Sequence, residues 1–378
     1  MVLYHYDSLD YVVGGCDLHS NLTFTVGTAV GYFQGYGGVS LSSQPYGISL
    51  NNGANLSFNG SPTQPGYFAN YSMVQEGGNG NWTTRGYMGG IVLNGSTTPY
   101  PQLSGDFTKY TVDAGNVIFR DAPAYGACGF FNCEFYNGNI GTYEIPAAYF
   151  TNCLFFRDNV EFPDQDYAVS FSFVNCTFYD GLLAMSRVSG LNGDSASFWL
   201  IKNTAFDGTA FAWADNLNGN PTNTFYDYNA YNTNNLSWQT YPFPYPPQYG
   251  TNEVVGPNDL MIGGYYRESS WFGNFYLPSD SPILAMGSTN ANFLGLYQFT
   301  TQTNQTPQED NLVDIGYHYV ATDGNGNPRD NGGNGIPDYL EDANGNGVVD
   351  SGELDWDISH DPGLTVIITQ PRNGSTLP

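Results

Sequence analysis

Apolar and polar residues alternate along the chain in short stretches that are separated by turn-forming Gly, Asn and Pro. Residues 22–26 (LTFTV) alternate at every position, and residues 39–41, 48–50 and 56–58 give three further short alternating phrases. A period of two places the apolar side chains on one face of a β-strand. The pattern therefore predicts an all-β chain whose short strands, joined by bends, form the sides of a coil.

One five-residue phrase returns four times in the middle of the chain. It reads FNCEF at 131–135, TNCLF at 151–155, VNCTF at 174–178 and KNTAF at 202–206, with a looser echo at 228–231. The four Asn residues are 20, 23 and 28 positions apart. Self-similarity at this period is typical of a stacked solenoid.

The residue types in this phrase suit a stack of coils. Cys133 and Phe135 lie two positions apart and share the inward face of an extended chain, whereas Glu134 points outward. Coils stack about 4.8 Å apart, so Asn can pass side-chain hydrogen bonds to Asn above and below while Phe stacks on Phe. The alternative is chance recurrence in a chain rich in Asn and Phe. Four recurrences favour a parallel β-helix.

Composition limits the classes of partner. The 378 residues carry 35 acidic and 9 basic side chains, a formal net charge of −26. This balance disfavours nucleic acid and favours divalent cations. No apolar segment is long enough to span a membrane. The first residues lack the basic and apolar regions of a signal peptide, so we expect a piece of a longer chain.

Four of the five cysteines lie between Cys128 and Cys176. Stacked in-register strands seldom present disulfide geometry, which favours reduced core thiols over a disulfide framework. The chain also lacks the CxxC pairs of a zinc site.

Two phrases near the C-terminal end carry a family resemblance. Residues 273–287 read GNFYLPSDSPILAMG and residues 313–319 read VDIGYHY. In this order they resemble the closing segment of bacterial extracellular right-handed β-helix proteins of the pectin-lyase-like superfamily. The chain departs from that pattern at Leu284 and Ala285, where Ile and Asp are usual, and at Tyr317-His318, where Ala-Tyr is usual. With the repeated phrases, the resemblance spans about residues 120–320 and implies a right-handed parallel β-helix.

Residues 321–357 contain nine acidic residues and one basic residue, Arg329. Residues 342–353 fit a twelve-residue calcium loop, with oxygen ligands at positions 1, 3, 5, 9 and 12, glycine at 6 and a backbone carbonyl at 7. Ca²⁺ takes six to eight hard oxygen ligands, which closely spaced carboxylates and amides supply. The predicted ligands are Asp342, Asn344, Asn346, Val348, Asp350 and Glu353.

The preceding twelve residues, 330–341, form a degraded copy whose third position, Gly332, has no side-chain oxygen. Its candidate ligands are Asp330, Asn334, Asp338 and Glu341. Residues 323–327 add a third partial loop. Together these loops resemble the calcium repeats of thrombospondin type 3 and dockerin-like modules of secreted bacterial proteins, which implies Ca²⁺ as cofactor. Asn ligands lower the charge of a site and fit weak, extracellular-range affinity. The alternative is a merely acidic, disordered linker.

Residues 364–374 resemble the first strand of a bacterial immunoglobulin-like domain, so calcium would stiffen a joint between neighbouring domains. The predicted organisation is β-helix coils at 1–235, closing segment and loops at 236–320, calcium-binding linker at 321–357, and the start of a truncated immunoglobulin-like domain at 358–378.

One stretch, residues 157–166, offers enzyme chemistry. Paired carboxylates could perform acid–base catalysis on a glycosidic bond, or hold calcium against a uronate while an arginine abstracts a proton. The candidates are Arg157, Asp158, Glu161, Asp164 and Asp166. The alternative is that these acids only solvate a loop, and the four scattered His form no metal or triad pattern.

The sequence thus predicts an all-β right-handed parallel β-helix with a short EF-loop-like calcium linker at its C-terminal end. We expect a non-catalytic, extracellular or cell-surface structural or adhesive protein whose exposed Tyr and Trp could bind polysaccharide or cell-surface glycans. The rival hypothesis is a carbohydrate-active enzyme, a polysaccharide lyase or glycoside hydrolase, on the same scaffold.

Overall fold

The computed structural model describes residues 2–3, 10–13, 15–32, 46–70, 89–112, 117–121, 126–141, 147–162, 170–185, 198–212, 224–232, 256–263 and 275–358. The chain divides into two compact units, Met1–Gly264 and Tyr265–Pro378. We call the first the stacked-sheet unit and the second the C-terminal unit.

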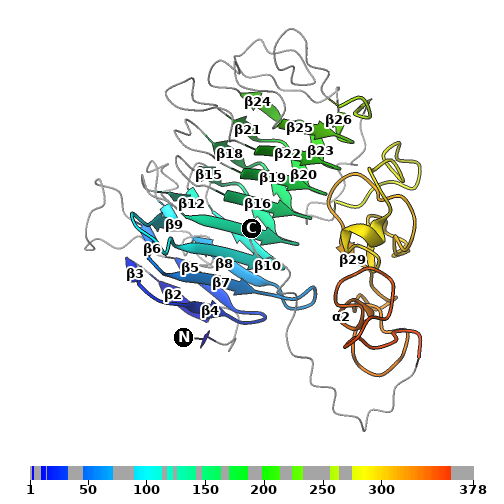
Figure 1. The fold of residues 1–378 in the computed structure, drawn as a ribbon, viewed down its shortest axis with the longest axis horizontal. Coiled ribbons are helices and arrows are strands. Elements are labelled where there is room, and N and C mark those ends of the chain that lie inside the picture. Colours follow the sequence, from blue (N-terminus) through cyan, green and yellow to red (C-terminus); the bar gives the residue numbers. More distant parts are fainter. Residues whose placement is uncertain are drawn as a thin grey trace, which may run out of the picture. The chain divides into compact units, whose positions relative to one another are not determined.

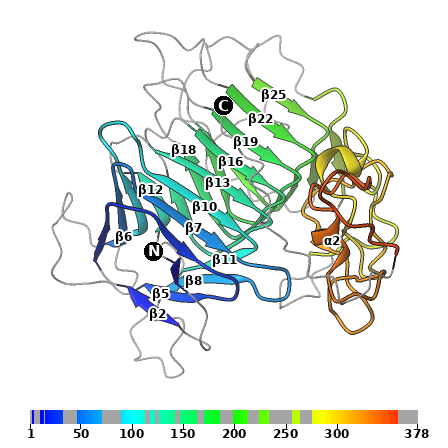
Figure 2. The same ribbon diagram turned by 60° about the horizontal axis from the view of Figure 1, so that its bottom comes forward.

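Three long sheets form the stacked-sheet unit (Figures 1 and 2). The first sheet contains β1 (Val2–Leu3), β4 (Leu22–Phe24), β7 (Asn55–Asn59), β10 (Gln102–Asp106), β13 (Ala127–Phe131), β16 (Ala147–Thr151), β19 (Ser170–Val174), β22 (Phe198–Lys202) and β25 (Thr224–Asp227). The second contains β2 (Tyr11–Val13), β5 (Ala29–Tyr32), β8 (Gly66–Asn70), β11 (Thr108–Thr111), β14 (Glu134–Tyr136), β17 (Leu154–Phe156), β20 (Thr177–Tyr179), β23 (Ala205–Asp207), β26 (Ala230–Asn232) and β27 (Leu260–Ile262). The third contains β3 (Cys16–Leu18), β6 (Tyr46–Asn51), β9 (Gly89–Asn94), β12 (Val117–Asp121), β15 (Asn139–Gly141), β18 (Asn159–Phe162), β21 (Leu182–Met185) and β24 (Ala210–Ala212).

The pairing rule within these sheets is simple. Almost every strand pairs in parallel with the strand three places further along the chain, so the chain passes through three sheets and returns one level higher. We call one such passage a coil. The predicted all-β class is confirmed, and the long all-parallel sheets are consistent with a parallel β-helix or solenoid.

The register places like residues on like residues in the interior. The rings of Phe135 and Phe155 stack with centroids 5.0 Å apart, and those of Phe155 and Phe178 with centroids 4.4 Å apart. On the facing sheet Phe130 and Phe150 stack at 5.3 Å. All five side chains are fully buried. Burial of each such ring contributes about 1.5–3 kcal/mol, so these columns supply much of the stability of the stack.

Asparagine forms the corner between the first and second sheets, as predicted. Left-handed backbone conformation recurs at Asn132, Asn152, Asn175 and Asn203, with φ between 52° and 54°. Asn tolerates this conformation better than most residues. The Nδ2 of Asn152 donates to Oδ1 of Asn132 at 2.8 Å, and the Nδ2 of Asn203 donates to Oδ1 of Asn175 at 3.0 Å. These bonds tie two pairs of successive coils together, whereas Nδ2 of Asn175 has no hydrogen-bond partner among the described residues, so the predicted ladder is interrupted between Asn152 and Asn175.

In five successive coils, the residue after the left-handed corner residue, which is Asn in four of them and Tyr228 in the fifth, donates a side-chain hydrogen bond. The Sγ of Cys176 contacts the carbonyls of Val174 and, one coil below, Phe150, at 3.4 and 3.5 Å. One coil higher, the hydroxyl of Thr204 donates to Lys202 and Phe173 at 3.1 and 3.2 Å. We call the equivalent residues Cys133, Cys153, Cys176, Thr204 and Asn229 the donor column. All five cysteines of the chain are free thiols.

The C-terminal unit consists mainly of turns and short elements. These elements are the 3₁₀ helix η3 (Ala291–Leu294), the antiparallel pair β28 (Phe299–Thr300) and β29 (Tyr319–Val320), and the single-turn helix α2 (Asp338–Glu341).

The two phrases that carry the family resemblance bond to each other in this unit. The amide of Ile315 donates to Ile283 at 3.1 Å, and the amide of Gly287 donates to Val313 at 2.8 Å. The buried carboxylate of Asp314 accepts the amide of Ala285 at 2.6 Å, the hydroxyl of Thr301 and the side-chain amide of Gln308. One carboxylate thus joins three loops.

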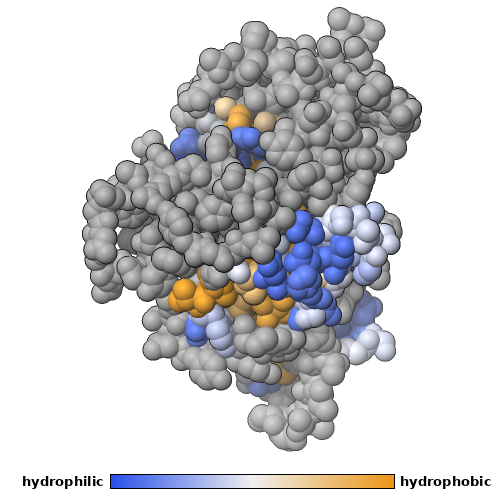
Figure 3. Space-filling model, turned by 90° about the vertical axis from the view of Figure 1, so that its left-hand side faces the viewer, coloured by the Kyte–Doolittle hydropathy of each residue, from blue (hydrophilic) through white to orange (hydrophobic). Residues whose placement is uncertain are grey.

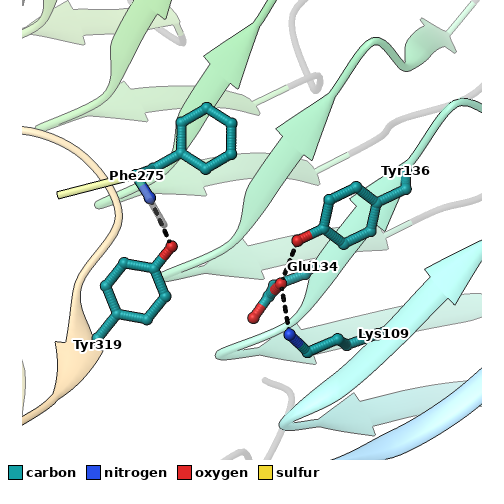
Figure 4. Close-up of polar contacts among 5 residues, drawn as sticks. All are labelled: Lys109, Glu134, Tyr136, Phe275 and Tyr319. Atoms are coloured by element: carbon teal, nitrogen blue, oxygen red, sulfur yellow. Dashed lines mark hydrogen bonds and ion pairs between the residues drawn. The ribbon is translucent and has the colours of Figure 1, made fainter. Parts of the chain in front are cut away.

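Two further residues complete this arrangement. The Tyr319 hydroxyl accepts the amide of Phe275 at 2.8 Å (Figure 4). His318 is buried, and burial lowers its pKa to about 4 despite the opposing attraction of Asp314. His318 is therefore neutral near pH 7.

Candidate calcium-binding site

The backbone of residues 342–353 is held closed by the first predicted ligand. Asp342 is fully buried, and its carboxylate accepts the amides of Asn346 and Gly347, both at 3.0 Å. Left-handed glycines at 345 and 347, with φ of 68° and 72°, make the bends that turn these amides inward. The chain therefore curves around the Asp342 carboxylate.

The other predicted side-chain ligands join the same network. The Oδ2 of Asp350 accepts the side-chain amides of both Asn344 and Asn346 at 2.8 Å. The two oxygens of Glu353 accept the backbone amides of Asn344 at 3.1 Å and Asp350 at 3.0 Å. All five side chains predicted to bind calcium through this loop thus lie in one hydrogen-bonded group. The sixth predicted ligand, Val348, is an exposed residue whose amide donates to Oδ1 of Asn346 at 2.7 Å.

The loop packs on the closing segment of its own unit. The amide of Tyr297 donates to the carbonyl of Gly345 at 3.1 Å. A Cβ at Gly347 would lie 2.2 Å from the Tyr297 ring, and one at Gly345 would lie 2.3 Å from the carbonyl oxygen of Gly295. Glycine is required here both for the bend and for the close approach. The loop is therefore part of the packed unit, unlike a solvated linker.

The degraded copy, residues 330–341, adopts the same local structure. The Asp330 carboxylate accepts the amides of Asn334 at 3.2 Å and Gly335 at 2.8 Å, and Oδ1 of Asn334 accepts the amide of Ile336 at 2.7 Å. These bonds repeat, position for position, those of the loop at 342–353. The side-chain amide of Asn334 donates to Glu341 at 2.7 Å.

Helix α2 carries the last two candidate ligands of this copy, Asp338 and Glu341, and both are buried. The Oδ1 of Asp338 accepts the amide of Asn331 at 2.7 Å. Its Oδ2 is buried and has no hydrogen-bond partner in the described part of the chain. Burial, with a smaller contribution from the negative charge of Asp330, raises the pKa of Asp338. A bound cation would reverse this shift.

The third partial loop is the most open of the three. Asp323 is exposed and accepts the amides of Asn325 and Asn327 at 2.8 and 2.9 Å. These amides lower the pKa of its carboxyl group.

The donor set of these loops suits a hard cation. Every candidate ligand offers oxygen, as Ca²⁺ prefers, and none offers the nitrogen or sulfur that Zn²⁺ selects. Within the described ranges, however, no three His, Cys, Asp or Glu side chains converge closely enough to hold a metal ion. The carboxylates of residues 342–353 instead accept the loop's own N–H groups.

The structure separates the two described residues at the start of the predicted catalytic stretch. Arg157 occupies the second corner with φ of 57°; its side chain is exposed, 3.5 Å from Asp180 and stacked over the Phe156 ring at 4.9 Å. Asp158 is fully buried between coils, where it accepts the amide of Gly138 at 2.6 Å. Burial raises the pKa of Asp158 well above its usual value.

The remaining catalytic candidates are Glu161, Asp164 and Asp166. Glu161 lies on β18, and partial burial raises its pKa. Asp164 and Asp166 lie outside the described residues. Arg157, Asp158 and Glu161 do not share one described polar cluster.

An aromatic row lies on the outer face of the second sheet. Tyr136, Phe156 and Tyr179 are equivalent residues of three successive coils; their ring centroids are 5.8 and 5.6 Å apart, and all three are half-buried. Beside the row, Glu134 accepts the Tyr136 hydroxyl and pairs with Lys109 at 3.0 Å (Figure 4). We call Tyr136, Phe156 and Tyr179 the aromatic row.

Other exposed apolar residues are scattered over the stacked-sheet unit. Tyr67 and Phe225 are each 43% exposed, and Val12 and Met261 are more exposed. On the side of the molecule shown in Figure 3, described hydrophobic and hydrophilic residues lie next to each other.

Sequence reasoning missed a pair of carboxylates at the last coil. Asp227 accepts the backbone and side-chain amides of Asn258, both at 2.9 Å, and Asp259 accepts the amide of Asn229 at 2.7 Å. Burial raises the pKa of Asp259 to about 7. The only available signal was a Pro-Asn-Asp turn directly before an apolar triplet at 260–262.

Comparisons with protein-family models, with curated proteins and with solved structures gave no match. Among the described residues, no helix is both long and apolar enough to cross a membrane.

Proposed function

We propose that this chain is a non-catalytic structural or adhesive protein that works outside the cell. In this proposal the stacked sheets form a right-handed parallel β-helix of the pectin-lyase-like type that serves as a spacer. Residues 321–357 bind Ca²⁺ and stiffen the connection to a neighbouring domain.

The observation that carries the proposal is the hydrogen-bonded group formed by Asp342, Asn344, Asn346, Asp350 and Glu353. Its members are spaced as a twelve-residue calcium loop requires, and all of them offer oxygen. Three of its members carry carboxylates, whose negative charge a divalent cation would neutralise.

Each residue has a distinct task when Ca²⁺ is bound. Asp342 both fixes the loop backbone and supplies a buried carboxylate oxygen. Asn344 and Asn346 supply neutral amide oxygens, and Asp350 and Glu353 supply carboxylates from the far side of the loop. Because the loop packs on Tyr297 and Gly295, ordering of the loop is transmitted to the closing segment.

A calorimetric Ca²⁺ titration of the full chain tests the proposal. We expect saturable binding in the range of about 10⁻⁴ to 10⁻³ M, typical of extracellular modules. Replacement of Glu353 by Gln should weaken this binding at least about tenfold, whereas Glu309→Gln, the same change at an exposed residue outside the loop, should leave it unchanged. Absence of binding at millimolar Ca²⁺ would refute the calcium function.

The adhesive part of the proposal rests on the aromatic row and on the exposed Tyr67 and Phe225, since sugar rings pack on aromatic faces. Retention of the chain on immobilised polysaccharide, and its loss on Phe156→Ala, would support glycan binding. The rival hypothesis of a carbohydrate-active enzyme needs carboxylates that converge at the surface. In the stretch 157–166 the described candidates do not meet this need, because Asp158 is buried and Arg157 is paired with Asp180.

A further inference from the structure

The degraded loop at 330–341 differs from the loop at 342–353 chiefly at its third position. That position is Asn344 in the second loop, exposed and hydrogen-bonded to Asp350. In the first loop it is Gly332, which is buried. Loss of this ligand would leave a calcium site one oxygen short.

The space that a side chain at 332 would occupy is filled by residues 356–358, which fold back against this loop. We call residues 356–358 the returning segment. A Cβ built on Gly332 would lie 2.9 Å from the carbonyl oxygen of Ile358 and 3.3 Å from that of Trp356. Two backbone oxygens thus stand where a ligand side chain at position 3 would begin. Backbone carbonyls are ordinary ligands of Ca²⁺.

Two contacts hold the returning segment in place. The Trp356 ring packs against Tyr297 with centroids 5.8 Å apart, and Trp356 is nearly buried. The amide of Ile358 donates to the carbonyl of Asp355 at 3.2 Å, which makes a turn at 355–358. The carbonyls of this turn are therefore fixed against the first loop.

A second observation points to a cation at the same place. Asp338 is 1% exposed, and it faces the loop, because its Oδ1 accepts the amide of Asn331. Its Oδ2 has no hydrogen-bond partner among the described residues. A buried carboxylate oxygen without a hydrogen-bond partner is unfavourable unless a cation or a proton neutralises the carboxylate.

We propose that residues 330–341 form a second Ca²⁺ site, completed at its third position by a backbone carbonyl of the returning segment 356–358. The remaining ligands are Asp330, Asn334, the carbonyl of Ile336, Asp338 and Glu341. Gly332 is then the residue that admits the substitute ligand, and its lack of a side chain is a requirement of the site. This inference rests on the proposed calcium function of the cassette.

Two bound Ca²⁺ ions would then stabilise the C-terminal unit, one at residues 342–353 and one at residues 330–341. The site at 330–341 joins two parts of the chain: the loop itself, which ends in helix α2 (Asp338–Glu341), and the returning segment 356–358. Ca²⁺ bound there would fix residues 356–358, the last described residues of the C-terminal unit. The site at 330–341, more than the loop at 342–353, would then hold this last described segment in place.

Calorimetric Ca²⁺ titration of the full chain and four variants tests the inference. We expect two Ca²⁺ ions per wild-type chain. Glu353→Gln should remove one site and Glu341→Gln the other. Gly332→Ala, which pushes the Ile358 carbonyl away, should weaken the Glu341-dependent site at least about tenfold and leave the Glu353-dependent site intact.

Gly141→Ala on β15, outside the cassette, is the matched control, because a Cβ there meets no atom within 4 Å; it should retain both sites. If the wild type binds a single ion that only Glu353→Gln abolishes, the second site is refuted while the proposed function stands. If two ions bind and Gly332→Ala changes neither, the carbonyl ligand is refuted. If no ion binds, both ideas are wrong. Circular dichroism of each variant distinguishes a lost site from a lost fold.

Discussion

At the scale of single residues, Asp158 shows how position decides the role of a carboxylate. It follows the left-handed corner residue Arg157 and points between coils, where it is fully buried and bonded to the amide of Gly138. Burial raises the pKa of this carboxyl group well above its usual value, so the protonated form is favoured in the fold. Such a group acts as a neutral structural acid.

The raised pKa gives a testable pH dependence. Unfolded Asp ionises near pH 3.9, whereas folded Asp158 stays protonated to higher pH. Stability from this group is therefore complete below about pH 3.9 and is lost as the pH rises toward the folded-state pKa. Asp158→Asn has nearly the same shape but no ionisable group, so its melting temperature relative to wild type should rise as the pH increases above about 4.

Asp180→Asn is the control for this series, because Asp180 is exposed and its pairing with Arg157 is screened by solvent. It should not reproduce the pH trend. If thermal melting shows that the Asp158→Asn variant loses stability relative to wild type as the pH rises, the carboxyl group is ionised in the fold. The interpretation of Asp158 as a buried neutral acid would then be wrong.

At the scale of elements, the repeated five-residue phrase is explained by the hydrogen bonds at the corners between strands as well as by packing in the core. The sequence predicted the Asn ladder and the stacked Phe columns, because both follow from period two and from like residues recurring. It treated Cys133, Cys153 and Cys176 only as core fillers. Their use as hydrogen-bond donors was hidden, since it depends on carbonyls that belong to the coil below.

The donor column makes a prediction at Thr204. Its hydroxyl serves the carbonyls of Lys202 and Phe173, and Val has the same shape without the donor. Thr204→Val should cost about 1–3 kcal/mol, because two buried acceptors lose a partner. Thr204→Cys should cost less, since Cys already occupies the equivalent place in three coils below.

Urea denaturation followed by circular dichroism measures both changes. Thr111→Val, at a half-exposed position on β11, is the control and should change the free energy of unfolding by less than about 0.5 kcal/mol. Equal stability of the Val and Cys variants at 204 would show that packing alone selects the residues of the column.

The proposed calcium loops illustrate what spacing can and cannot reveal. The pattern of candidate ligands from Asp342 to Glu353 was readable, because these residues lie within twelve positions. The approach of Trp356 and Ile358 to Gly332 was not, because it joins residues more than twenty positions apart through a turn with no motif. The same limit hid the pairing of Asp227 with Asn258.

At the scale of the whole molecule, the stacked-sheet unit consists of coils that repeat the same strand pairing and the same register. Each coil contacts mainly its two neighbours, and equivalent residues lie in register along the stack. For a repeat of this kind, stability is close to a sum of terms for single repeats and for their interfaces. We therefore expect the unit to fold with one coil removed, provided that the inward-facing residues of the remaining coils stay in register.

Deletion of residues 152–174 tests this property. It removes one full repeat and joins Thr151 directly to Asn175, so Asn175 takes the corner place of Asn152 and Phe150 faces Ile201 where Phe173 was. We expect a folded protein with an unchanged β-sheet spectrum per residue and a single thermal transition at modestly lower temperature. Deletion of residues 152–173, one residue fewer, should fail, because it shifts the chain by one position and turns inward side chains outward. If both deletions fold equally well, or if both fail, the register of the columns does not control the stack.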